Sequence, residues 1–187
     1  MTPLLAAAAD ALGLLERHGI PACVVGGLAV ARWGEPRLTS DVDLVALTAI
    51  ERDEEAIDLL LGSLEPRMPD ARDFAIAHRT LLVRDARGIP IDVALGALEF
   101  ERAMIDRSSL WAVDGGPPVR TASAEDLLVM KAFAGRDRDW SDISGIVTRQ
   151  GSKLDRTATL ERLRPLAEFA SDPEALVRLE AILARSS

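Results

Sequence analysis

The pattern of hydrophobic and polar positions divides the chain into a first portion that mixes strands with helices and a second portion that is helical throughout. Short apolar runs bounded by turn residues predict strands at residues 21–25 and 41–47, and on both sides of a turn at 86–88. Segments with apolar residues three or four positions apart separate these runs and predict helices. We therefore expect an α/β (α+β) fold with a small mixed β-sheet and flanking helices.

Capping and turn residues set the limits of the predicted elements. Thr2 and Pro3 can begin a helix that Gly19 ends, since proline suits the first helical position and glycine the position after the last. The other elements predicted before residue 123 are helices at 28–33, 50–64 and 97–107, a loop containing Pro66 and Pro69, and a strand pair interrupted by 115–118.

From Ser123 onward the sequence predicts only helices. Ser123 and Asp126 resemble a capping box, and apolar residues recur at helical spacing with breaks near Gly135, Gly151 and residues 171–173. We expect an α/β core over residues 1–121 and a helical C-terminal portion over residues 122–187 that packs on it.

Composition narrows the class of protein. Apolar residues at 48% and charged residues at 28% are typical of a globular domain. The net charge of −8 disfavours a broad nucleic-acid-binding surface, because such surfaces are usually basic. The single cysteine, Cys23, excludes an internal disulfide, and no apolar stretch reaches the roughly 18 residues of a membrane helix. We expect a cytoplasmic protein that does not bind a membrane.

Three aspartates are the candidate catalytic and metal-binding residues. Asp41 and Asp43 lie one residue apart in a strand pattern, so their side chains should share one face roughly 6–7 Å apart. Asp92 lies in the middle of another apolar strand. Carboxylates at such spacing can share divalent ions about 3.5–4 Å apart. The structural alternatives are a capping role for Asp41 and a hydrogen-bonded buried role for Asp92.

A glycine pair upstream of these acids suits phosphate binding. Gly26 and Gly27 lie between a strand and a helix, where backbone N–H groups can approach a phosphate closely. Arg37, Thr39 and Ser40 lead directly into the acids and could donate to phosphate oxygens, although a polar loop would have the same composition.

Other functions of these motifs do not fit. Asp41 to Val45 matches the nucleophile motif of haloacid-dehalogenase-type phosphatases, but GEPRLTS precedes it where that motif follows a hydrophobic strand. An EF-hand loop starting at Asp41 lacks the required glycine and glutamate. Ala29 and Val30 break the dinucleotide-binding glycine pattern.

The combination of glycine pair, D-x-D and a third acid on a later strand resembles the DNA polymerase β-type nucleotidyltransferase superfamily. Within it, GGLAVARWGEPRLTSDVDLV, IDVALGALEFERAMIDR and EDLLVMKAFAGRDRDWSDI are similar to AbiE-type (AbiEii) toxin nucleotidyltransferases and related small bacterial proteins. The resemblance covers roughly residues 20–145.

The resemblance implies a role for each matching residue. Asp41, Asp43 and Asp92 would hold Mg²⁺ or Mn²⁺, and Asp92 would help to deprotonate an acceptor hydroxyl. Gly26 and Gly27 would cradle the phosphates of an NTP substrate. The resemblance also implies that Lys131 contacts the triphosphate. Asp139 and Asp142 would either stabilise the helical portion or face the site, although the alternating charges of residues 136–139 are equally typical of a solvated helix face.

The resulting hypothesis is a metal-dependent nucleotidyltransferase that moves NMP from NTP to a hydroxyl acceptor and releases pyrophosphate. The acceptor could be tRNA, a protein or a small molecule, and the protein would act as a toxin with a cognate antitoxin. The first alternative is a catalytically silent nucleotide-binding or antitoxin-like partner with the same fold. The second is an interaction protein that uses residues 123–187 as a docking surface.

Overall fold

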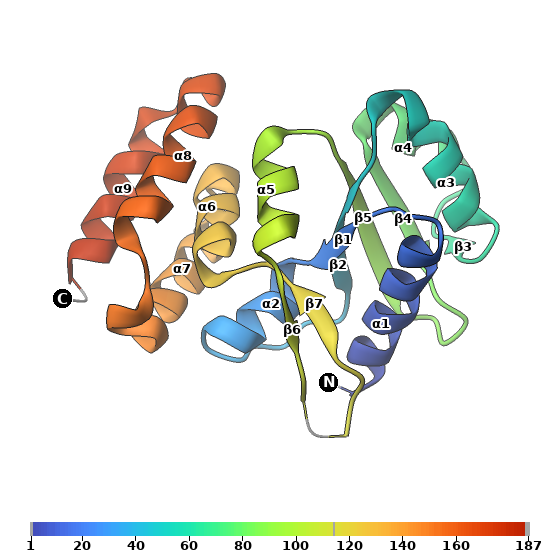
Figure 1. The fold of residues 1–187 in the computed structure, drawn as a ribbon, viewed down its shortest axis with the longest axis horizontal. Coiled ribbons are helices and arrows are strands. Elements are labelled where there is room, and N and C mark those ends of the chain that lie inside the picture. Colours follow the sequence, from blue (N-terminus) through green and yellow to red (C-terminus); the bar gives the residue numbers. More distant parts are fainter. Residues whose placement is uncertain (1, 114, 186–187) are drawn as a thin grey trace. The chain divides into compact units, whose positions relative to one another are not determined.

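A computed structural model describes residues 2–113 and 115–185. The portions predicted over residues 1–121 and 122–187 therefore include residues 1, 114 and 186–187, which lie outside the described residues. The chain forms two compact units. The first contains residues up to Leu28 and Leu38–Ala122, and the second contains Ala29–Arg37 and the chain from Ser123 onward. The α/β class is confirmed, because helices and strands follow one another along the chain up to residue 121 and the described strands form one mixed sheet (Figure 1).

Within the described residues of the first unit, seven strands form this sheet in the order β3-β4-β5-β2-β1-β7-β6. The central strand β2 pairs in parallel with β5 and antiparallel with β1. In chain order the strands are β1 (Ala22–Val24), β2 (Val42–Leu47), β3 (Glu65–Pro66), β4 (Thr80–Arg84), β5 (Pro90–Gly96), β6 (Ser109–Trp111) and β7 (Val119–Thr121).

One face of the sheet is buried under three helices. α1 (Thr2–Arg17), α3 (Asp53–Leu61) and α4 (Ala71–His78) share a single apolar core with the sheet, and they lie together in Figure 1. Alternate strand residues such as Val42, Leu44 and Ile91 point into this core and are fully buried. The residues between them therefore point to the opposite face.

The opposite face of the sheet carries the acids. α5 (Glu99–Arg107) contacts β2, with Met104 and Ile105 buried. Asp43 and Asp92 lie on this second face and are neither buried nor fully exposed. The sheet thus presents two acids whose side chains are partly accessible.

The second unit consists of helices apart from its loops and capping turns. Its helices after residue 122 are α6 (Ala124–Ala134), α7 (Asp137–Gln150), α8 (Arg156–Ala170) and α9 (Pro173–Arg185), with a 3₁₀ turn at Gly151–Lys153. Ser123 caps α6 as expected, since its hydroxyl accepts from the Asp126 N–H at 3.1 Å. No helix in the described residues of either unit is long and apolar enough to cross a bilayer.

An early segment of the sequence belongs to this helical unit. α2 (Gly26–Trp33) begins in the first unit and continues into the second at Ala29. The Gln150 side-chain amide donates to the Trp33 carbonyl at 2.5 Å, and the Arg149 guanidinium donates to the Ala31 carbonyl at 3.4 Å. These long-range bonds tie the last turn of α2 to α7.

The structure corrects two predictions about the segment from residue 48 to residue 78. The helix predicted over 50–64 is a 3₁₀ turn, Ile50–Arg52, followed by α3, and the Thr48 hydroxyl donates to the Asp53 carboxylate at 2.5 Å at the start of α3. The predicted loop around Pro66 contains the two-residue strand β3 and is followed by α4, which the sequence analysis missed.

Candidate functional site

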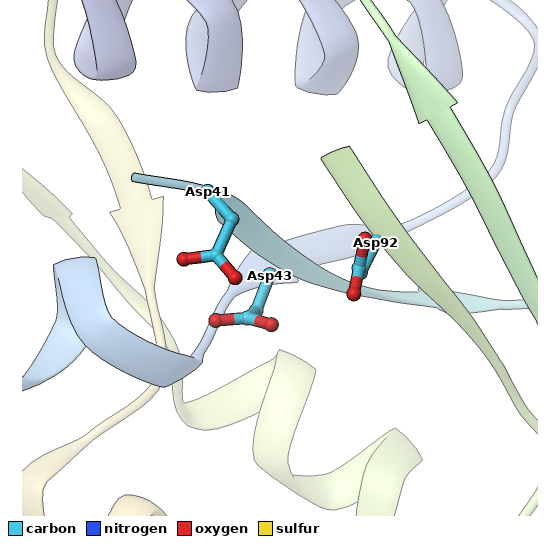
Figure 2. A group of neighbouring side chains, drawn as sticks. All are labelled: Asp41, Asp43 and Asp92. Atoms are coloured by element: carbon cyan, nitrogen blue, oxygen red, sulfur yellow. The ribbon is translucent and has the colours of Figure 1, made fainter. Parts of the chain in front are cut away.

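The three predicted acids lie together on the face of the sheet opposite α1, α3 and α4. β2 and β5 are parallel neighbours whose register pairs Asp43 with Asp92, so the two side chains point to the same face. Asp41 lies just before β2, two residues from Asp43. Each of the three residues offers a carboxylate oxygen within 4.8 Å of the others, and Figure 2 shows the three side chains on one side of the strands.

Such a cluster is electrostatically costly in isolation. Two unit charges about 4.8 Å apart repel by roughly 3–4 kcal/mol at an effective dielectric constant of about 20. A bound cation would relieve this repulsion. Hard oxygen donors at this spacing are the ligands that Mg²⁺ prefers when substrate phosphates and water complete its coordination. The residues present thus fit the metal that the sequence analysis expected.

The glycine pair accommodates the acids. Gly26 has a φ of +58°, a left-handed conformation that favours glycine, and a Cβ there would lie 2.7 Å from the Asp43 Cβ and overlap its carboxylate. The Gly27 N–H donates to Asp43 Oδ2 over 3.4 Å, and a Cβ at Gly27 would lie 2.8 Å from the Thr39 Cβ. Glycine at both positions brings the start of α2 directly against the acids.

The loop before β2 contributes one direct contact to the cluster. The Thr39 hydroxyl donates to Asp41 Oδ1 at 2.9 Å, whereas Ser40 is exposed. Thr39 therefore orients an acid in this structure. Its predicted contact with phosphate, and that of Ser40, stay predictions.

Arg67 is a charged residue beside the acids that local sequence patterns do not predict. The Arg67 guanidinium forms an ion pair with Asp92, and both side chains are about one-third exposed, at 33% and 32%. Arg67 directly follows the two-residue strand β3. Nothing in the local pattern distinguishes this arginine from other loop arginines, since only strand pairing brings it near Asp92.

Arg37 and Lys131, two of the predicted nucleotide-binding residues, belong to the second unit. There the Lys131 ammonium contacts Asp139 at 2.9 Å and Asp142 at 2.7 Å, with all three side chains less than 8% exposed. Arg37 donates to both oxygens of Asp142, at 2.9 Å and 3.2 Å. These ion pairs form a buried charged cluster, so Asp139 and Asp142 are not part of a solvated helix face.

The hydrogen bonds in this cluster perturb the Asp139 carboxyl group. Burial by itself favours the protonated form, but hydrogen bonds from Arg136 and Lys131 outweigh it, so the pKa of Asp139 lies below its usual range. Asp139 is therefore ionised throughout the neutral range. The contact of Lys131 with a triphosphate stays a prediction.

Comparison with known structures identifies the class of fold. The crystal structure of an antigenic nucleotidyltransferase-like protein from Paracoccidioides brasiliensis aligns with a TM-score of 0.52 at 16% identity, covering 95% of this chain and 92% of that chain. The solution structure of the antibiotic-resistance factor ANT(2″)-Ia aligns with a TM-score of 0.49 at 15% identity, over 98% of this chain and 91% of that chain. The first of these shows that the chain has a nucleotidyltransferase-like fold.

The family follows from the sequence itself. Residues 15–185 match the model of the nucleotidyl transferase AbiEii toxins of type IV toxin–antitoxin systems, and the chain belongs to that family. No curated protein sequence matches the chain. The resemblance inferred from the motifs is therefore confirmed, and so is the general class of nucleotidyltransferase.

Proposed function

We propose that the protein is a metal-dependent nucleotidyltransferase that transfers NMP from an NTP to a hydroxyl group of an acceptor. The observation that carries the proposal is the convergence of three carboxylates within 4.8 Å of one another beside β2 and β5, in a chain of this family. Asp41, Asp43 and Asp92 would hold Mg²⁺ or Mn²⁺. The bound cation would supply neutralisation of the acids and of the charge that develops on the phosphate oxygens.

The residues of the chain have distinct tasks in this proposal. Asp43 lies in β2 and accepts a hydrogen bond from the Gly27 N–H, so it fixes the acids relative to the N-terminus of α2. The backbone at Gly26 and Gly27 approaches the phosphates of the NTP because neither residue has a side chain. Thr39 holds the Asp41 carboxylate in position.

The transfer exchanges one phosphorus–oxygen bond for another and needs no oxidant or reductant. The acceptor oxygen forms a bond to the α-phosphorus, the bond from the α-phosphorus to the bridging oxygen breaks, and pyrophosphate leaves. The hydroxyl proton passes to the Asp92 carboxylate. Family membership favours a toxin that has a cognate antitoxin, with tRNA, protein or small molecules as the acceptor classes to be tested.

A transfer assay tests the proposal. The wild-type protein is incubated with Mg²⁺ and each α-labelled NTP, together with total tRNA, a protein lysate or aminoglycosides. We expect a labelled product that the Asp43→Asn variant forms at least about 100-fold more slowly, since electrostatic terms of this kind contribute several kcal/mol. Asp73→Asn, which changes an exposed acid on α4, is the matched control and should retain full activity.

Two results would contradict the proposal. Equal labelling by the wild-type protein and Asp43→Asn would show that the Asp43 carboxylate takes no part in the transfer reaction. Binding of NTP without transfer to any acceptor class would favour the catalytically silent alternative.

A further inference from the structure

The pairing of the strands places Arg67 in one row with two of the acids. The Arg67 N–H donates to the Leu82 carbonyl at 3.1 Å and so extends the β3–β4 pairing by one residue. Leu82 is the register partner of Asp92, and Asp92 is the register partner of Asp43. The row across the sheet therefore runs Arg67, Leu82, Asp92, Asp43, with the side chains of register partners on one face.

The partner of Arg67 distinguishes it from other arginines in the first unit. Arg84 pairs with Glu65 at 2.6 Å and Arg72 with Asp58 at 2.7 Å, and both of those acids lie outside the carboxylate cluster. Exposed pairs of this kind contribute about 0–1 kcal/mol to stability. Arg67 instead neutralises one of three acids that repel one another.

The same guanidinium suits a second partner. Arginine remains charged at all physiological pH values and presents five N–H donors in a planar fork that matches phosphate oxygens. A cation held by the three acids would draw charge from Asp92 and so weaken its pairing with the guanidinium. Arg67 would then lie beside the site with donors available to a bound phosphate.

We propose that Arg67 is a phosphate-binding residue of the site, which pairs with Asp92 before the metal binds and with a substrate phosphate afterwards. This inference rests on the proposed function. The phosphate belongs either to the triphosphate of the NTP or to the acceptor, and the two sources share the same recognition chemistry. Arg67 is in addition a counter-charge that limits how tightly the acids bind a cation alone.

Binding measurements on the intact protein separate these effects without any turnover. The probes are Mn²⁺ alone, followed by electron paramagnetic resonance, and inorganic tripolyphosphate with Mn²⁺, followed by calorimetry. We expect Arg67→Gln to bind Mn²⁺ about 3–10-fold more tightly, because a positive charge beside the ligands is lost. If the phosphate is that of the NTP, we expect Arg67→Gln to bind tripolyphosphate about 10-fold more weakly, because a charge-assisted hydrogen bond is lost.

Two further variants serve as controls. Arg84→Gln removes the same charge from the neighbouring strand β4 and should change neither affinity. Arg67→Lys retains the charge but not the fork, so its Mn²⁺ affinity should stay near that of the wild-type protein. It also keeps the test usable if Arg67→Gln folds poorly.

A second experiment assigns the phosphate to its source. Binding of a short labelled RNA oligonucleotide is measured on protein saturated with Mn²⁺ and tripolyphosphate. Weaker tripolyphosphate binding by Arg67→Gln assigns Arg67 to the NTP, and weaker RNA binding alone assigns it to the acceptor. Unchanged binding of both ligands overturns the proposal. A parallel loss of Mn²⁺ affinity also overturns it, because Arg67 would then only hold Asp92 in place.

The failure of this inference is distinguishable from the failure of the proposed function. If the wild-type protein binds no Mn²⁺, the three acids are not a metal site and both proposals fail. If the wild-type protein binds Mn²⁺ and Arg67→Gln behaves like Arg84→Gln, only the role of Arg67 is wrong.

Discussion

At the scale of single residues, the site depends on the absence of two side chains. Gly26 has positive φ and lies directly against the Asp43 side chain, so the strand-to-helix turn and the acid occupy adjoining space. A phosphate-binding role and a space-making role are compatible here. Both require glycine, because a methyl group at this point would displace the carboxylate.

The variant Gly26→Ala tests this argument. We expect it to lose stability by at least about 1–2 kcal/mol from the left-handed backbone alone, and to lose Mn²⁺ binding because the added Cβ displaces Asp43. Urea denaturation and Mn²⁺ titration measure the two effects separately.

Gly88→Ala is the control for Gly26→Ala. Gly88 also has positive φ, at +80°, but a Cβ there meets nothing within 4 Å. We expect a similar loss of stability from backbone strain and an unchanged affinity for Mn²⁺. Normal Mn²⁺ binding by Gly26→Ala would show that the turn and the acid are not coupled.

At the scale of secondary-structure elements, the charged cluster of Lys131, Asp139 and Asp142 joins α6 to α7. Loss of any one of these three buried charged side chains should destabilise the fold, because a buried charge without full compensation remains. Arg37 extends the cluster to the segment after α2. The sequence motif that the family resemblance identified thus has a structural function inside the helical unit.

Replacement of the lysine should therefore destabilise the fold as well as affect substrate binding. We expect Lys131→Met to lower the free energy of unfolding by about 3 kcal/mol, since Arg37 and Arg136 still pair with the two acids. Lys153→Met, at the exposed other lysine of the chain, should lie within about 0.5 kcal/mol of the wild-type protein. Urea denaturation that finds the two variants equally stable would refute the structural role.

The same cluster predicts a pH dependence of stability. The pKa of Asp139 is lower in the folded protein than its usual value, so its ionised form stabilises the fold above about pH 4. This contribution is lost as the pH falls through the folded pKa. We expect the wild-type protein to be more stable than Asp139→Asn at pH 7 and the difference to shrink below about pH 4. Thermal unfolding of both proteins from pH 7 to pH 3 measures it, and a constant difference would argue against the assignment.

At the scale of the whole molecule, the sequence predicted the mixed sheet and the three acids because both follow from local periodicity. Asp43 and Asp92 lie in apolar strands whose alternation identifies their face. Arg67 could not be predicted, because its place depends on a two-residue strand that pairs only in the folded sheet. The membership of Ala29–Arg37 in the helical unit depends likewise on contacts with residues more than 100 positions later.

The central claim is that the acids direct chemistry at the α-phosphorus of an NTP. The most direct measurement compares product labelling from α-labelled and γ-labelled NTP under identical conditions, with EDTA and Asp43→Asn as controls. We expect label to enter the acceptor from the α position only, and both controls to abolish it. Label that enters from the γ position, or that survives EDTA, would exclude metal-dependent transfer of NMP.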